Sequence, residues 1–328
     1  MQMERTRAKS LNWSPVLGTP GWSAMQSKRA LDVIQIDAFT DRPYGGNPAM
    51  VVLEADRLSD ENIRAIAGEM SVGQTVFVLS SKTADFRLSY WTPGGEMDFS
   101  GHLTVAAFLA LIEVGLAEIP QDVTMFELET KAGMLQVEVV KNEQTALHEI
   151  QITHEKAEFL ETYDPVDYAE ALGLSLADIM SPHPVQTVST GTPQLMIPVN
   201  TPKSLERIQP DWKRLNELQQ ESDWVSIQVF SPETGKAAPD VHVRHFAPAL
   251  GINEDPVTGS AAASMCWYML RYGIVNASYP VTSIVIAQGS FVNRPGRIFV
   301  EVRGDEDVIQ HVKVSGTGVI VLRGKLYF

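Results

Sequence analysis

The sequence predicts an α+β protein built from two similar halves, and three observations lead to that prediction. Short alternating or apolar runs bounded by turn residues are numerous, as in a strand-rich protein. Helical patterns are fewer and do not alternate regularly with the strands, so a doubly wound parallel sheet fits poorly. One stretch of the first half returns in the second half with its apolar and aromatic positions in register.

We expect residues 1–30 to be a disordered or flexible extension, followed by the first strand. The predicted strands are the runs at 32–39, 49–54, 74–79, 85–91, 134–140, 195–199, 224–230, 240–246, 283–287, 298–303 and 317–322. The predicted helices are 60–70 with Ser59 as its N-cap, 102–114, 166–172 behind Pro165, 211–220 behind Pro210, and 260–272.

The internal repeat is the most informative local feature. Residues 85–93 (DFRLSYWTP) match residues 240–248 (DVHVRHFAP) at an offset of 155 residues. Each match leads into a loop with Gly and acidic residues. A small-residue helix follows, which opens at Gly101 or Gly259 and closes at another Gly fourteen positions later. The agreement of strand, Pro, Gly and helix length indicates one strand–loop–helix plan used twice. Ordinary strand–turn–helix punctuation is the simpler alternative for any single match.

Composition limits the partners of this protein. The 328 residues are 44% apolar, enough for two domain-sized cores, and 40 acidic against 26 basic residues give a net charge of −14. Such a charge repels nucleic acid and anionic membrane surfaces. No run of 18 apolar residues and no secretory signal is found, and the single Cys266 suits a reducing compartment. We therefore expect a cytoplasmic protein that binds neither nucleic acid nor membrane.

The repeat also predicts where a ligand binds. Corresponding loops of pseudo-symmetric halves face each other across a shared cleft, and both helices open with small residues that let a ligand approach the backbone N–H groups. Each helix N-terminus carries about half a positive charge. Because the net charge of −14 repels small acids, an anionic metabolite needs such local positive potential. We expect a carboxylate to bind around residues 101–104 and 258–261.

Common catalytic signatures are missing, and two loops hold the remaining candidates. The sequence contains no P-loop, GxGxxG, HExxH or GxSxG motif, and the seven His residues lack metal-ligand spacing, so we expect no metal. Glu96, Asp98, Ser100 and His102 follow the first repeat, and Glu254, Asp255, Thr258 and Ser260 follow the second. Helix N-capping is an alternative role for the Ser, Thr and Asp residues among them. His102, near a helix N-terminus, should be a neutral imidazole.

These loops belong to a longer series of motifs that resembles the PhzF-like phenazine-biosynthesis isomerase family. The matching residues are Asp37-Ala38-Phe39-Thr40, Gly46-Asn47-Pro48-Ala49, Ala67-Gly68-Glu69-Met70-Ser71, Gln74-Thr75-Val76-Phe77-Val78, Thr92-Pro93, Gly101-His102-Leu103-Thr104, Glu254-Asp255-Pro256-Val257-Thr258-Gly259-Ser260-Ala261, Gln288-Gly289 and Arg294-Pro295. The resemblance runs from about residue 32 to the C-terminus. The GHxT and EDPxTGSA motifs together are its most specific part.

The resemblance implies a diaminopimelate-epimerase-like fold of two pseudo-symmetric domains, each a curved sheet around a central helix, with the active site in the cleft between them. The domains would be 31–150, completed by the last strand at about 315–328, and 151–314. It also implies a homodimer that moves protons at carbon without a cofactor, as in the isomerisation of a dihydro-hydroxyanthranilate. Such chemistry needs a base that becomes an acid and stabilisation of an enol-like intermediate.

Residue by residue, His102 and Asp255 match the family's site His and Asp. Gly101, Gly259 and Ser260 match its substrate-binding loops, and Asn47 lies in its GNP turn; we add Ser100, Thr104 and Thr258, beside these loops, as substrate-binding candidates. One position departs, because Gln74 stands where the family has its proton-shuttling glutamate. An amide hydrogen-bonds in nearly the same shape but cannot carry a proton at neutral pH.

The departure leaves several alternatives open. Asp255, His102 or Asp98 could be the base, Gln74 could orient a substrate that needs no strong base, or Gln74 could be an engineered replacement. A catalytically silent protein that binds a metabolite or a partner is a rival, as is an amino-acid epimerase. Two-thiol racemisation is excluded, because Cys266 is the one cysteine.

Overall fold

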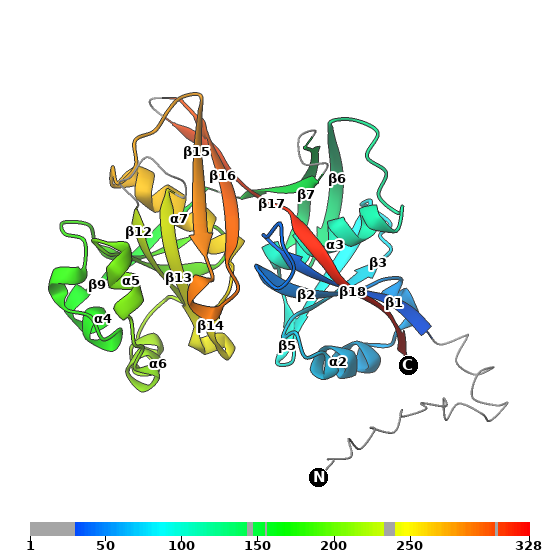
Figure 1. Cartoon of the computed structure of the whole chain (residues 1–328), viewed down its shortest axis with the longest axis horizontal. Helices are drawn as coiled ribbons and strands as arrows, with labels where there is room; N and C mark the ends of the chain where they lie inside the picture. Colours follow the sequence, from blue (N-terminus) through cyan, green and yellow to red (C-terminus); the bar gives the residue numbers. More distant parts are fainter. Residues whose placement is uncertain (1–29, 143–146, 155, 233–239, 306–307) are drawn as a thin grey trace, which may run out of the picture.

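The computed structural model describes residues 30–142, 147–154, 156–232, 240–305 and 308–328. Apart from Ala30, the expected N-terminal extension lies outside these residues. Figure 1 shows two groups of strands side by side, each curved around one helix: α3 (Gly101–Glu113) in the first and α7 (Gly259–Arg271) in the second. The mixture of strands and helices confirms the predicted α+β class.

The first group contains β1 (Ala30–Ala38), β2 (Asn47–Val52), β3 (Thr75–Leu79), β4 (Phe86–Thr92), β5 (Gly95–Met97), β6 (Val123–Thr130), β7 (Gly133–Lys141), β18 (Gly318–Tyr327) and α2 (Asp60–Glu69). The second contains β9 (Glu158–Tyr163), β10 (Val185–Ser189), β11 (Pro193–Pro198), β12 (Ser226–Pro232), β13 (Val241–Ala247), β14 (Ile252–Asp255), β15 (Val281–Gln288), β16 (Gly296–Gly304), α4 (Pro165–Ala171), α5 (Pro202–Arg207) and α6 (Trp212–Gln220). Short 3-10 turns lie at Ala55–Arg57, Leu176–Asp178, Pro248–Leu250 and Ser290–Val292.

The repeat found in the sequence is repeated in the sheet topology. Strand β4 pairs antiparallel with β3 and parallel with β6, and β13 pairs antiparallel with β12 and parallel with β15. The Asp residue that opens each copy accepts a backbone hydrogen bond from the neighbouring parallel strand. The Glu127 amide donates to the Asp85 carboxylate over 2.8 Å, and the Val285 amide donates to the Asp240 carboxylate over 2.7 Å.

The same register reveals a second repeated segment. Met50 of β2 lies opposite Thr75, which lies opposite Trp91; Leu195 of β11 lies opposite Ile227, which lies opposite Phe246. Trp91 and Phe246 are equivalent in the 155-residue repeat, so residues 46–52 (GNPAMVV) correspond to residues 191–197 (GTPQLMI).

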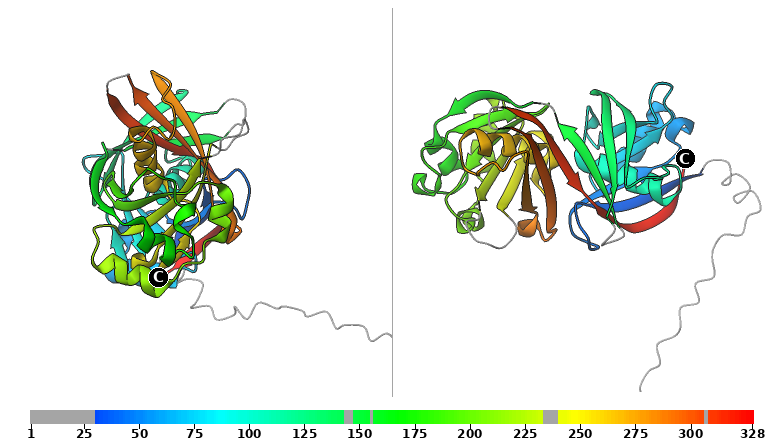
Figure 2. Two further views of the ribbon diagram at one scale, coloured as in Figure 1. Left: turned by 90° about the vertical axis from the view of Figure 1, so that its left-hand side faces the viewer. Right: turned by 90° about the horizontal axis from the view of Figure 1, so that it is seen from above.

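Two strands join the groups, and a third returns the chain to its start. Strand β8 (His148–His154) pairs with β7 on one side and with β17 (Ile309–Gly316) on the other, and β17 also pairs with β16. Strand β18 then crosses to the first group and pairs with β1 from Ala30 to Ala38 (Figures 1 and 2). The predicted boundaries near residues 150 and 315 fall inside β8 and β17, where Ile150 lies opposite Gly316.

The central helices are buried because their sequences are apolar on all sides. Ten of the thirteen residues in each of α3 and α7 are buried, and both helices belong to one core cluster. Helix α2 covers the opposite face of β1–β4 with a separate apolar cluster, and α4, α5 and α6 do the same in the second group. The central position of α3 and α7 brings their N-termini together at the junction.

Candidate active site

The N-termini of the two central helices meet at the junction of the halves. A Cβ atom placed on Gly101 would lie 3.9 Å from the Gly259 Cα atom, so the two helices begin within van der Waals reach of each other. Ser100 and Thr258 hold the N-cap positions, yet neither side chain accepts a hydrogen bond from its own helix. The first-turn N–H groups therefore have no side-chain cap, which suits an anion site.

Asp255 lies just before α7 and is 8% exposed. The Asn47 amide donates to its Oδ1 atom over 2.9 Å, and the Thr258 hydroxyl donates to its Oδ2 atom over 2.5 Å. Burial raises the pKa of Asp255 to about 6, although the two hydrogen bonds act in the opposite direction. The carboxyl group is therefore held in one orientation with a pKa close to neutrality.

Asn47 of the first half and Gln288 of the second half both hydrogen-bond to the Asp255 loop. Asn47, in the first half, also donates to the Val257 carbonyl over 2.9 Å, so this one amide joins the two halves. The Gln288 amide nitrogen donates to the Asp255 carbonyl over 2.9 Å, and its oxygen accepts from the Thr258 amide over 3.2 Å. In the sequence, Gln288 stands out only as part of the Gln288-Gly289 motif, which does not predict this supporting role.

His102 is the second residue of α3 and is 5% exposed. Its Nδ1 atom lies 3.3 Å from the Ser100 hydroxyl, while its Nε2 atom is buried and has no hydrogen-bond partner among the described residues. Burial lowers the pKa of His102 to about 3, so the ring is neutral at physiological pH, as predicted. One ring nitrogen is thus available to a ligand.

Gln74 directly precedes β3 and is half-buried. Its carbonyl accepts from the Met50 amide over 3.2 Å, which places it beside Ala49 on the neighbouring strand. Because side chains alternate along a strand, Gln74 shares the face of Val76 and Val78, which pack in the core cluster that contains α3. Asn47 and Ala49 lie on this face of β2.

Two further candidates, Thr104 and Ser260, lie near the starts of α3 and α7. Thr104 is fully buried, and its hydroxyl donates to the Ser100 carbonyl and bonds the Tyr90 hydroxyl, each over 2.8 Å. Ser260, the second residue of α7, accepts a hydrogen bond over 3.1 Å from Gln194, a residue that sequence reasoning missed. The sequence signal that points to Gln194 is the Gly-x-Pro pattern just before it, because Gly191-Thr192-Pro193 repeats Gly46-Asn47-Pro48 of the first half.

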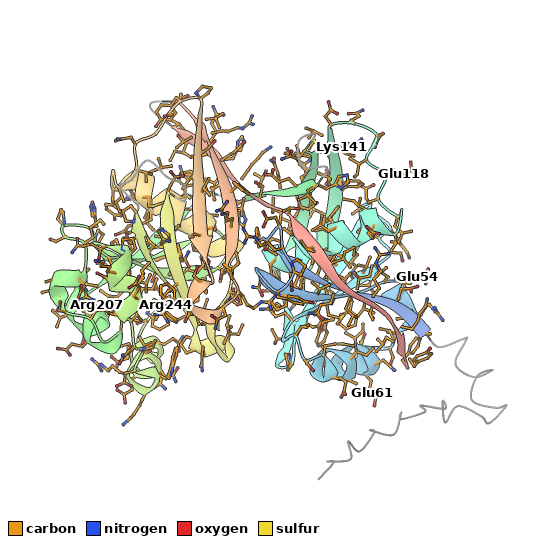
Figure 3. All side chains as sticks on the ribbon, in the orientation of Figure 1. Glu54, Glu61, Glu118, Lys141, Arg207 and Arg244 are labelled. Atoms are coloured by element: carbon orange, nitrogen blue, oxygen red, sulfur yellow. The ribbon has the colours of Figure 1, made fainter. Side chains whose placement is uncertain are left out.

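The loop acids are not part of the buried cluster. Asp98 is exposed and pairs with Lys131 over 2.9 Å. Glu96 accepts from the Ser89 hydroxyl over 2.7 Å. Glu254 forms a two-point pair, with distances of 3.0 and 2.7 Å, with Arg244 of the second half, which is labelled in Figure 3. These contacts give each acid a structural partner.

Two other motifs form a clamp between the halves. The Arg294 guanidinium donates to the buried Asp37 carboxylate over 2.6 Å and to the Gly45 and Gly46 carbonyls over 2.8 and 2.9 Å. A cavity of about 560 Å³ lies beside this clamp, between the 40–45 loop and β16. None of the predicted site residues lines it. At the predicted site, His102 and Asp255 are buried, whereas Gln74, Thr258 and Ser260 are partly exposed.

Comparison with known proteins agrees with this geometry. The family model described as "phenazine biosynthesis-like protein" matches residues 36–324. An uncharacterized isomerase, YfhB, of Bacillus subtilis is 35% identical over 294 residues, covering 88% of this chain and 96% of the relative. The chain belongs to the phenazine biosynthesis-like (PhzF) family.

Solved structures give the same result. The PhzF-family phenazine biosynthesis protein of Bacillus anthracis superimposes with a TM-score of 0.82 at 31% identity, covering 92% of this chain and all of that one. A hydroxyproline epimerase from Agrobacterium vitis shares the fold, with a TM-score of 0.62 at 12% identity and coverage of 93% and 94%. The shared fold and the relatives named as isomerases together show that this PhzF-family chain is an isomerase.

Among the described residues of this PhzF-family protein, no three His, Cys, Asp or Glu side chains gather as a metal site would. In the same part of the chain, no helix is long and apolar enough to cross a membrane.

Proposed function

We propose that this isomerase transfers a proton between carbon atoms of a small carboxylate-bearing metabolite without a cofactor. The family resemblance suggests a dihydro-hydroxyanthranilate-like compound or another biosynthetic intermediate. The observation that carries the proposal is the meeting of two uncapped helix N-termini beside the buried carboxyl group of Asp255. The helix ends would bind the carboxylate while Asp255 handles the proton.

Asp255 has the properties of a group that removes and returns a proton. With a pKa of about 6, it is mostly ionised at pH 7, and the proton it accepts remains readily available for return. Asn47 and Thr258 hold both oxygens, so the carboxyl group keeps its direction when its charge changes. Ser100, Gly101, Gly259 and Ser260 would contact the substrate around it.

His102 would stabilise the intermediate. Its neutral ring can share a hydrogen bond through Nε2 with a developing enolate oxygen, in a buried setting where such a bond is stronger than in water. Gln74 would orient the substrate through its amide and would not carry the proton. Thr104, whose hydroxyl bonds Ser100 and Tyr90, would support the first turn of α3.

A catalytically altered member that binds a metabolite or a partner without converting it is the second candidate, and Gln74 is the residue that favours it. The proposal also keeps the homodimer, the cytoplasmic location and the division into domains of 31–150 with 315–328 and of 151–314, which the resemblance and the internal repeat support. An amino-acid epimerase would be recognised by solvent deuterium appearing at an amino acid's α-carbon.

Proton NMR in D2O of the dihydro-hydroxyanthranilate tests the proposal directly. The substrate would be incubated with the unmodified protein and with the Asp255→Asn and Gln74→Glu variants. We expect isomerisation with deuterium uptake by the unmodified protein and a loss of about 100-fold or more in Asp255→Asn, because an amide cannot accept the proton. Thermal melting of each variant separates lost chemistry from lost folding.

The other outcomes point elsewhere. Turnover by Gln74→Glu alone would mean that the cleft recognises this substrate while Gln74 blocks the reaction. Undiminished turnover in Asp255→Asn would remove Asp255 as the base. A compound that raises the melting temperature and is left unchanged by all three proteins would favour the binding candidate.

A further inference from the structure

Gln194 occupies a position where the two halves differ. In the second repeated segment it corresponds to Ala49 of the first half. The second residues of the two central helices differ as well, because α3 has His102 where α7 has Ser260. In the first half, the small Ala49 on the strand therefore accompanies the large His102 on the helix. In the second half the sizes are reversed, with the large Gln194 on the strand and the small Ser260 on the helix.

The Gln194 side chain is buried and only partly satisfied. It is 2% exposed, and its amide nitrogen donates to the Ser260 hydroxyl oxygen over 3.1 Å. Its Oε1 atom is buried and has no hydrogen-bond partner among the described residues. Burying an unpaired acceptor costs free energy, so such an atom calls for an explanation. His102 Nε2, at the start of the facing helix, is unpaired in the same sense.

Next to α7, the Oε1 atom of Gln194 is a free hydrogen-bond acceptor among the described residues, and the Ser260 hydroxyl is a nearby donor. Because Ser260 accepts from Gln194, its own hydroxyl hydrogen remains able to donate, while Gln194 Oε1 can accept. Both lie at the N-terminus of α7, where the proposed function places the substrate carboxylate. A substituent adjacent to that carboxylate would therefore meet the amide of Gln194.

We propose that Gln194 is a specificity-determining residue, which with Ser260 selects substrates carrying an amino or hydroxyl group next to the carboxylate. This inference rests on the proposed function, because it assumes that the carboxylate binds at the helix N-termini. A site that accepts a hydrogen bond discriminates strongly against an analogue without the donor, since its own buried acceptor then stays unpaired.

Calorimetric titration with 2-aminobenzoate and benzoate, which differ only by the amino group, tests this inference. The proteins are the unmodified chain, Gln194→Met, and Gln186→Met as a control. Gln186 is a buried glutamine of the adjacent strand β10, whose amide nitrogen and oxygen bond the Leu160 carbonyl and the Tyr272 hydroxyl. We expect the unmodified protein and the control to bind 2-aminobenzoate about tenfold or more tightly than benzoate.

Gln194→Met should bind both compounds with the benzoate affinity of the unmodified protein. An unchanged preference for 2-aminobenzoate in Gln194→Met would overturn the role of Gln194 and leave the carboxylate site intact. An equal loss of both affinities would mean that Gln194 only supports the fold. Binding of neither compound to the unmodified protein would overturn the carboxylate site and this inference with it.

Discussion

Asp255 shows how neighbouring residues turn an ordinary carboxyl group into a candidate catalyst. Burial alone disfavours its charge, and the hydrogen bonds from Asn47 and Thr258 restore part of what burial costs. Gln288 holds the backbone of the same loop, so the carboxyl group has little freedom to turn toward water. The EDPxTGSA motif identifies the residue, but its pKa depends on partners up to 208 positions away.

The raised pKa of Asp255 predicts a particular pH dependence of stability. Since the folded protein binds this proton more tightly than the unfolded chain, the stabilisation is complete below pH 3.8 and is lost as the pH rises through about 6. The difference amounts to about 3 kcal/mol. Relative to Asp255→Asn, the unmodified protein should lose about that much free energy of unfolding between pH 4 and pH 7.

Guanidinium unfolding of both proteins at several pH values measures this difference. The comparison at each pH removes the contribution of the buried histidines, which both proteins share. Parallel stability curves would show that Asp255 titrates as an ordinary carboxyl group.

At the scale of elements, the loop that carries the Arg294 clamp depends on close backbone contacts. Gly289, with φ of 90°, begins the turn that carries Arg294 to the clamp, and a Cβ there would lie 2.2 Å from the Arg294 carbonyl oxygen and 2.7 Å from that of Pro256. Gly251, with φ of 74°, has no atom within 4 Å of such a Cβ. The two glycines therefore separate backbone strain from steric contact.

Gly289→Ala should destabilise the protein by at least about 3 kcal/mol, because a left-handed conformation and overpacking both add to the cost. Gly251→Ala should cost only about 1 to 2 kcal/mol, from the left-handed conformation alone. Chemical unfolding of both variants measures the difference. Similar losses in the two variants would mean that contacts at Gly289 are relieved by movement of the loop.

Local sequence patterns predicted the capped helices well and missed several strands, because a cap is a local signal and strand alternation depends on which side chains are buried. Helix α2 begins where Ser59 indicated, and α6 begins one residue after its predicted start behind Pro210. In both helices the N-cap side chain, Ser59 or Asp211, accepts a hydrogen bond from its own first turn. Strand β6 was not predicted, because Val123 and Met125 are exposed and hide the alternation on which strand prediction depends. Strands β5, β8, β9, β10, β14 and β17 and helix α5 were missed as well.

At the scale of the whole molecule, the end of the chain completes its beginning. Strand β18 pairs with β1 over the length of that strand, on the edge opposite β2. Without β18, the N–H and C=O groups of β1 on that edge would lose their partners, and the core behind them would open to water. The first half therefore forms fully only after the second half has been synthesised.

Deletion of residues 318–328 should leave the first half unfolded and the protein prone to aggregation, because β1 becomes an unpaired edge. Hydrogen exchange of the β1 amides and the melting temperature measure the effect. Lys325→Ala is the control, since Lys325 and its partner Asp32 are both exposed and such a pair contributes less than about 1 kcal/mol. A deletion variant that melts like the intact protein would contradict this role of β18.

The sequence by itself determined the α+β class, the two-fold repeat and the loops that precede the central helices, because these follow from periodicity, turn residues and motifs that are local in the chain. Only the tertiary structure decided that Asn47 joins Asp255 across the halves, that Gln288 supports the loop, and that Gln194 lies beside Ser260. Burial raises the pKa of Asp255 and lowers that of His102, and burial depends on how distant segments pack.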